Sequence, residues 1–179
     1  MNIVKYPDRK DWVSLLERPH RDASELRETV KTVLDRIQED GDAAVKEFEQ
    51  KFDKVQLESL AVSEAEMQEA EGLVSPDLAD ALKLAHSNIE KFHASQKFNS
   101  AKVEVAPGVV CWQKSVPIEK VGLYIPGGTA PLFSTVLMLA TPAKIAGCKE
   151  IVLCTPPNRE GKVHPAILVA ARIAGVNKI

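Results

Sequence analysis

The 179-residue sequence lacks the features that mark secreted, membrane or nucleic-acid-binding proteins. Its three cysteines are an odd number and too few for a disulfide scaffold, which favours a reducing cytoplasm. No apolar run approaches the roughly 18 residues that cross a bilayer, because Thr141, Pro142 and Lys144 interrupt the longest candidate. The N-terminus has no apolar segment of a secretion signal, and no run of basic residues indicates a nucleic-acid surface. We therefore predict a cytoplasmic protein that binds neither membrane nor nucleic acid.

The sequence does have an ordinary globular composition, but its two parts differ. Hydrophobic residues make up 45% and charged residues 27% of the chain, which is typical of a folded protein. Residues 1–100 hold 14 basic and 21 acidic side chains, whereas residues 101–179 hold 9 and 4, together with most of the glycine and proline. This division predicts a predominantly helical region over 1–100 and a β-hairpin with a βαβα unit over 101–179.

The first region has the apolar spacing of amphipathic helices. Three sets of apolar residues recur every three or four positions: Leu26, Val30, Val33, Leu34 and Ile37; Val45, Phe48 and Phe52; Leu78, Leu82, Ala85, Ile89 and Phe92. Gly41 predicts the end of the first helix. Ser63 with Glu66 is a capping-box pattern for a short third helix, and Ser75 predicts an N-cap for the fourth.

The second region has the pattern of strands joined by tight turns. Strands over 103–106 and 109–116 flank Pro107-Gly108, which predicts a hairpin. Apolar runs over 121–125 and 151–154 predict strands buried on both faces, and helices are predicted over 134–146 and 165–174. The alternation of strand and helix predicts an α/β fold in which the helical N-terminal region precedes an incomplete Rossmann-like parallel sheet.

The best candidate for a ligand site is the turn Tyr124-Ile125-Pro126-Gly127-Gly128-Thr129-Ala130-Pro131. It follows the carboxyl end of a predicted strand and enters a helix, which is where open α/β sheets bind ligands. The two glycines allow close approach of a phosphate or flat ligand, and the helix N-terminus favours an anion. The turn matches neither G-x-G-x-x-G nor a P-loop, so spacing alone predicts a ligand loop and a structural turn equally well.

The other polar residues form no convincing catalytic or metal cluster. Cys148 and Cys154 flank a predicted buried strand with no histidine near them in sequence, which favours core packing over nucleophilic catalysis. His86 and His93 lack the i, i+4 spacing of a helical metal motif, and His164 falls in a predicted loop. Spacing therefore assigns no catalytic residue and no metal ligand.

The long run from Val121 to Cys148 resembles histidinol dehydrogenase. Shorter matches surround it: Gly41-Asp42-Ala43-Ala44, Phe52-Asp53, Pro107-Gly108-Val109, Thr155-Pro156-Pro157 and Ala174-Gly175-Val176. One local departure is Val116, where the family is expected to carry an arginine. The matches cover essentially the whole chain, which resembles the N-terminal portion of a longer family member. The resemblance implies that 101–179 is a truncated nucleotide-binding region.

The resemblance implies a zinc-dependent, NAD-linked, cytoplasmic homodimer in histidine biosynthesis. Such an enzyme oxidises L-histidinol to L-histidinaldehyde and then to L-histidine, with NAD⁺ as the oxidant of both steps. The tyrosine of the family's motif contacts NAD, which carries over to Tyr124, with Pro126 beside it as a weaker candidate. The family's zinc ligands and its Glu-His acid/base pair belong to segments beyond this chain, so the resemblance assigns no catalytic or metal residue here.

Two alternatives remain open at this point. The chain is a non-catalytic folded fragment, or a nucleotide-binding or dimerisation module, since the expected metal and acid/base residues are missing. Alternatively, the enzyme resembles aldehyde dehydrogenases and forms a thioester at Cys111, Cys148 or Cys154. Because the metal and acid/base residues implied by the resemblance are missing, we expect the 179-residue chain by itself to be inactive.

Overall fold

The computed structural model describes residues 3–18, 24–128 and 130–179. Its contacts divide the chain into two compact units, residues 1–44 and 45–179, and each unit is described separately below. The change in composition comes later, near Ser100, where helices give way to strands. The division into a helical region 1–100 and a nucleotide-binding region 101–179 stays a prediction.

The first unit is built from helices. Its segments, in chain order, are the 3-10 helix η1 (Arg9–Asp11), α1 (Trp12–Leu16), α2 (Ser24–Asp40) and the start of α3 (Asp42–Phe52). Gly41 adopts a φ of +57° and separates α2 from α3, as predicted. The amphipathic helix predicted from Leu26 to Ile37 is confirmed as α2, but none of its residues is buried.

The second unit combines helices with two small sheets. Besides most of α3, its elements are α4 (Glu64–Leu73), α5 (Pro76–Ala94), β1 (Val103–Ala106), β2 (Val109–Cys111), β3 (Lys120–Tyr124), α6 (Phe133–Ala146), β4 (Glu150–Cys154) and α7 (Pro165–Ala174). The order strand, helix, strand, helix at its end confirms the predicted α/β class.

Local chemistry sets the ends of these helices. The Ser63 hydroxyl accepts a hydrogen bond from the Glu66 N–H, and the Glu66 carboxylate accepts one from the Ser63 N–H, so the predicted capping box of α4 is confirmed. Ser75 caps α5 in the predicted way. Gly147 and Gly175 adopt the left-handed conformation that ends α6 and α7.

A parallel pair of strands, β3 and β4, forms the centre of the α/β part. In this pair Lys120 lies opposite Glu150, and Tyr124 lies opposite Cys154. Helix α6 makes the crossover connection that a parallel pair requires. On the other side of β4, the Leu153 N–H donates to the Lys178 carbonyl at 2.9 Å, so the chain around Lys178 adds a third parallel segment.

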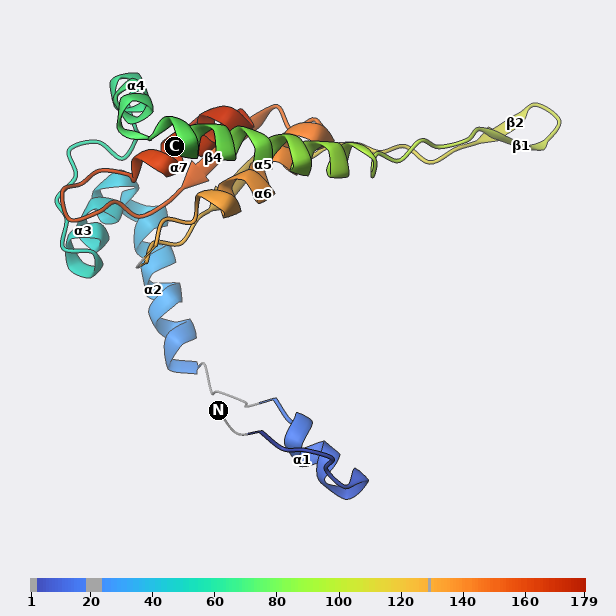
Figure 1. Cartoon of the computed structure of the whole chain (residues 1–179), viewed down its shortest axis with the longest axis horizontal. Coiled ribbons are helices and arrows are strands. Elements are labelled where there is room, and N and C mark those ends of the chain that lie inside the picture. The colour runs from blue at the N-terminus through green and yellow to red at the C-terminus, as the bar shows by residue number, and fades with distance from the viewer. Residues whose placement is uncertain (1–2, 19–23, 129) are drawn as a thin grey trace. The chain divides into compact units, whose positions relative to one another are not determined.

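Helices α5, α6 and α7 pack against one another (Figure 1), and α6 contacts both β3 and β4. Val121 and Leu123 of β3 are partly buried, whereas Gly122 and Tyr124 are exposed. Because successive side chains of a strand point to opposite faces, this alternation means that the second face is not covered by the described residues. The prediction that β3 is buried on both faces is therefore wrong, because the helices cover only one face of the sheet.

The predicted hairpin is present as β1 and β2, and it extends from the body of the second unit (Figure 1). Gly108 at its turn has a φ of +79°, and its N–H donates to the Glu104 carboxylate at 2.8 Å. Strand β2 ends at Cys111, so the strand predicted over 109–116 is too long. A two-stranded ribbon whose residues are all exposed gains little from packing, which explains its early end.

Candidate functional site

The carboxyl ends of β3 and β4 bring two loops to one edge of the sheet. Directly after β3, the Ile125 N–H donates to the Cys154 carbonyl at 2.9 Å, which extends the parallel pairing by one residue. Ile125 is fully buried and anchors the loop that leads into α6. The loop after Cys154 leads into α7. Both loops therefore emerge at the edge where α/β sheets bind ligands.

Both residues predicted to bind a cofactor lie at this edge and are accessible. The side chain of Tyr124 is 65% exposed. Its register with Cys154 places both side chains on the uncovered face of the sheet. Pro126 is exposed in the loop that follows Ile125. The structure thus brings Tyr124 and Pro126 together, and their contact with a dinucleotide stays a prediction.

The start of α6 adds backbone N–H groups to the same edge. Leu132 occupies the N-cap position, where its apolar side chain accepts no hydrogen bond. The first turn of α6 contains no acidic residue that would occupy the positive end of the helix dipole. This helix start is suited to an anion such as a phosphate group. Thr129, in the loop before it, lies outside the described residues.

Within the described parts of the chain, no three side chains of His, Cys, Asp or Glu are placed to hold a metal ion. The Nδ1 atom of His93 lies 2.7 Å from the Gln96 side-chain oxygen at the end of α5. His164 accepts a hydrogen bond from the Ala166 N–H and caps α7. The capping role of His164 was missed, although Pro165 at the first helical position was a usable signal. These histidines do not fit a zinc site.

Core packing was predicted for Cys148 and Cys154, and the structure buries neither of them fully. Cys148, after α6, is half-buried, but Cys154 is exposed at the end of β4, and Cys111 is exposed in the hairpin. Cys154 is exposed because it lies on the uncovered face, opposite Tyr124. The prediction of core packing is therefore wrong for Cys154.

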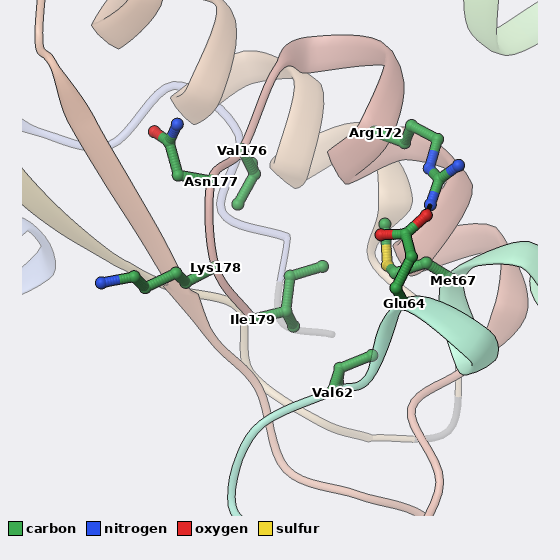
Figure 2. A pocket seen from close by; sticks show the side chains of 8 residues that line it. All are labelled: Val62, Glu64, Met67, Arg172, Val176, Asn177, Lys178 and Ile179. Carbon is green, nitrogen blue, oxygen red and sulfur yellow. Dashed lines mark hydrogen bonds and ion pairs between the residues drawn. The ribbon is translucent and has the colours of Figure 1, made fainter.

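A separate pocket of about 360 Å³ lies between the start of α4, the end of α7 and the C-terminal segment (Figure 2). On its wall, the Arg172 guanidinium lies 2.5 Å from a Glu64 oxygen and 3.0 Å from a Glu71 oxygen. The hydrogen bond to Glu64 is the main cause that raises the pKa of Arg172. These ion pairs join α7 to α4, and neither Tyr124 nor Pro126 lines the pocket. We therefore assign it a structural role.

Among the described residues, no helix has the length and apolar character to cross a membrane.

Comparisons with known proteins agree on one family. A family model described as histidinol dehydrogenase matches residues 16–179. Over 179 residues the chain is 59% identical to histidinol dehydrogenase of Bacteroides thetaiotaomicron and 60% identical to that of Bacteroides fragilis. Each match covers 100% of this chain and 42% of the relative, so the chain spans less than half of the relatives' length.

A solved structure gives the same result for the fold. The crystal structure of histidinol dehydrogenase from Elizabethkingia anophelis matches with a TM-score of 0.90 and 49% sequence identity. The match covers 95% of this chain and 39% of that chain. The fold is thus similar to part of that larger structure.

Proposed function

Because the chain belongs to the histidinol dehydrogenase family, we propose that it supplies the dinucleotide-binding edge of an NAD-linked enzyme. The proposed enzyme oxidises L-histidinol through L-histidinaldehyde to L-histidine. The observation that carries the proposal is that Tyr124, the last residue of β3, is 65% exposed directly before the loop that leads to the start of α6. Bound NAD⁺ supplies the acceptor for the hydride that leaves the substrate carbon.

Each part of the edge has a task in holding the dinucleotide. The ring of Tyr124 offers a flat apolar surface, with Pro126 beside it, against which an aromatic ring of the cofactor packs. The N–H groups at the start of α6 favour the negative charge of the phosphates. Gly128 carries no side chain and has open space at its Cβ position, so the cofactor approaches the backbone of the loop closely there.

The remaining parts of the proposal rest on the family. They are zinc dependence, a homodimer and a cytoplasmic location. The described residues do not fit a zinc site, so we propose that the zinc ligands and the acid/base pair are supplied by parts of the enzyme other than these. On this basis the 179-residue chain by itself has no dehydrogenase activity and serves as a folded cofactor-binding module.

A thioester route is a second candidate, because Cys154 is exposed opposite Tyr124. In this route the thiolate attacks the aldehyde carbon, and hydride transfer to NAD⁺ leaves a thioester that water hydrolyses to the acid. The family assignment favours the zinc route. Retained turnover of the aldehyde by a full-length relative in which all of its matching cysteines are alanine would exclude the thioester.

The decisive experiment follows NADH formation from L-histidinol with added Zn²⁺. The 179-residue chain and a full-length relative are assayed in parallel, and binding of NAD⁺ to the chain is measured separately by calorimetry. We expect turnover from the full-length protein only and NAD⁺ binding by both. Turnover by the chain alone would contradict its proposed role as an inactive module, and an inactive full-length relative would contradict the enzyme assignment.

A further inference from the structure

Gly127 lies against Pro156 across the two loops of the candidate site. A methyl group built on Gly127 would lie 2.5 Å from Cγ and 3.6 Å from Cβ of Pro156. A methyl group on the neighbouring Gly128 would meet no heavy atom within 4 Å. Neither glycine has the positive φ that strains other residues, so the two positions differ in available space alone. Of these two glycines, only Gly127 has no room for a side chain.

Pro156 has little freedom to move away from Gly127. Its Cγ belongs to a ring that is closed onto the backbone, so no rotamer change withdraws it. Pro157 follows directly and restricts residue 156 to extended conformations. Pro156 is also half-buried. A side chain at position 127 therefore displaces a loop rather than a flexible side chain.

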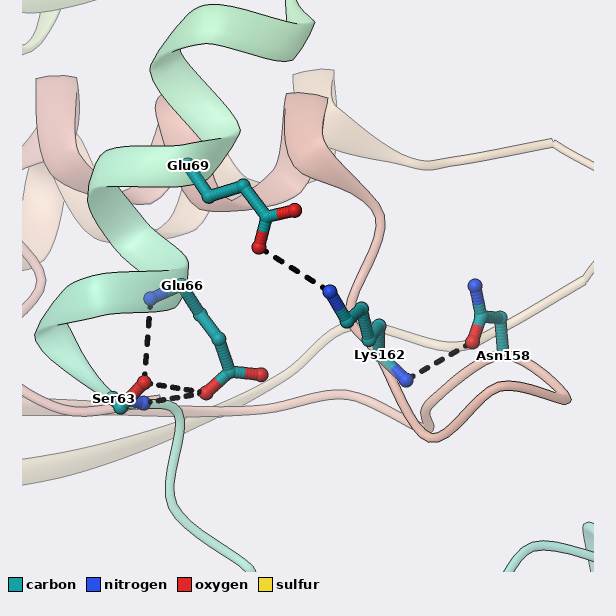
Figure 3. A network of polar contacts seen from close by, with 5 residues as sticks. All are labelled: Ser63, Glu66, Glu69, Asn158 and Lys162. Atoms are coloured by element: carbon teal, nitrogen blue, oxygen red, sulfur yellow. Dashed lines mark hydrogen bonds and ion pairs between the residues drawn. The ribbon is translucent and has the colours of Figure 1, made fainter.

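The loop that carries Pro156 is fixed at both ends. Before it, the Cys154 carbonyl accepts the hydrogen bond from Ile125. After it, the Asn158 side-chain oxygen accepts hydrogen bonds from the N–H groups of Glu160 and Lys162, at 2.9 and 3.0 Å. Figure 3 shows that Lys162 in turn reaches Glu69 on α4, at 3.2 Å. An exposed ion pair thus joins the turn that follows Pro157 to α4.

We propose that Gly127 and Pro156 are positioning residues for the dinucleotide-binding edge. Their close contact, which only glycine at position 127 permits, fixes residues 126–128 against the loop over 155–157. It thereby fixes the start of α6 relative to Tyr124. The consequence for NAD⁺ rests on the function proposed above. With a side chain at position 127, residues 126–128 move outward and the N–H groups of α6 no longer meet the phosphates.

Four variants of the 179-residue chain test this proposal: Gly127→Ala, Pro156→Ala, the double variant, and Gly72→Ala in α4 as the control, where an added methyl group meets no heavy atom within 4 Å. The dissociation constant of NAD⁺ is measured by calorimetry, and amide hydrogen exchange is followed over 125–136. We expect Gly127→Ala to raise the dissociation constant about tenfold or more and to speed exchange in this segment. Pro156→Ala loses the contact but creates no clash, so we expect a smaller rise of about threefold, and Gly72→Ala should bind as the unmodified chain does. Adding Gly127→Ala to Pro156→Ala should change the dissociation constant little, because the ring no longer occupies the space.

The melting temperature of each variant separates positioning from global stability. We expect exchange in α7 to be unchanged in Gly127→Ala. If Gly127→Ala does not fold, recovery of folding in the double variant supports the contact, and no recovery overturns it. Normal NAD⁺ binding by Gly127→Ala, or a double variant as weak as Gly127→Ala, also overturns the proposal. If the unmodified chain binds no NAD⁺, the proposed function fails, and the exchange pattern still decides whether the contact holds the loop.

Discussion

Tyr124 and Cys154 are register partners at the carboxyl ends of neighbouring parallel strands, and their side chains share the uncovered face of the sheet. A large group attached to Cys154 must therefore occupy the space above Tyr124. We predict that a maleimide label on Cys154 raises the dissociation constant of NAD⁺ about tenfold or more. Calorimetry on a variant whose other cysteines are alanine measures this effect.

The hairpin offers a matched control for the label. Cys111 is also exposed but lies in β2, which pairs only with β1 among the described strands. The same label on Cys111 should leave NAD⁺ binding unchanged. Equal inhibition from both positions would show that the cofactor does not bind over Tyr124.

Replacement of Tyr124 tests the proposed stacking surface directly. Contacts between bases and aromatic rings contribute about 1–3 kcal/mol, so Tyr124→Ala should weaken NAD⁺ binding by about tenfold or more. Tyr124→Phe keeps the ring and should bind nearly as the unmodified chain does. Because the side chain is 65% exposed, neither change should lower the melting temperature much. Trp112→Ala, at an exposed aromatic residue next to the hairpin, is the control expected to have no effect on binding.

The capping box of α4 predicts a pH-dependent contribution to stability. Hydrogen bonds from Ser63, first from its N–H and then from its hydroxyl, hold the pKa of Glu66 below its ordinary value of 4.5. A lowered pKa in the folded state means that the contribution is present above pH 4.5 and is lost as the pH falls through the lowered pKa. Glu66→Gln should therefore reduce the free energy of unfolding by about 0.5 kcal/mol at neutral pH, where solvent screens the partly exposed carboxylate.

Urea unfolding of Glu66→Gln and of the unmodified chain at several pH values measures this difference. The two curves should converge in acid, because the protonated carboxyl no longer accepts both hydrogen bonds. Glu90→Gln replaces an exposed glutamate of α5. Its free energy of unfolding should change between neutral and acid pH by the same amount as that of the unmodified chain. A constant gap between Glu66→Gln and the unmodified chain at every pH would contradict the assigned cause.

The carboxylate of Glu150 links the three parallel segments of the sheet. It lies 2.8 Å from the Lys178 ammonium and 3.4 Å from that of Lys120. The hydrogen bond from Lys178 is the main cause that lowers the pKa of Glu150. Glu150→Gln should lower the melting temperature at low salt and remove most of its dependence on salt, because the ion pairs are screened. A melting temperature that keeps its full salt dependence in Glu150→Gln would show that other charges dominate.

Glu119→Gln provides the control for this prediction. Glu119 pairs with Lys149 at 3.5 Å, and both side chains are more than three-quarters exposed. A single pair of this kind contributes little to stability. We expect its removal to change the melting temperature less than Glu150→Gln does at every salt concentration. A larger effect from Glu119→Gln would contradict the role of Glu150 in the sheet.

Local patterns in the sequence were sufficient for most elements of the fold. Ser63 and Ser75 mark the starts of α4 and α5 through chemistry confined to a few neighbouring residues. Gly147 and Gly175 mark the ends of α6 and α7 in the same way. The turn after β3 was expected at the sheet edge because βα loops of a parallel sheet lie there, whereas the contact of Tyr124 with a cofactor was inferred from the family resemblance and stays a prediction.

Features that depend on contacts between distant segments were not predictable in this way. The exposure of Cys154 depends on which face of the sheet the helices cover, and an apolar run of a few residues does not contain that information. The approach of Gly127 to Pro156 joins loops that follow different strands. The sequence places a glycine at position 127, but it does not indicate that a side chain there would meet Pro156.

The charges on the three parallel segments also bear on how the sheet assembles. The middle strand, β4, carries the acid Glu150, and the two outer segments carry the bases Lys120 and Lys178. If another segment took the middle place, the two ammonium groups would become neighbours and repel each other. The carboxylate therefore favours the observed order, with β4 in the middle, by a small amount, because the lysines are mostly exposed.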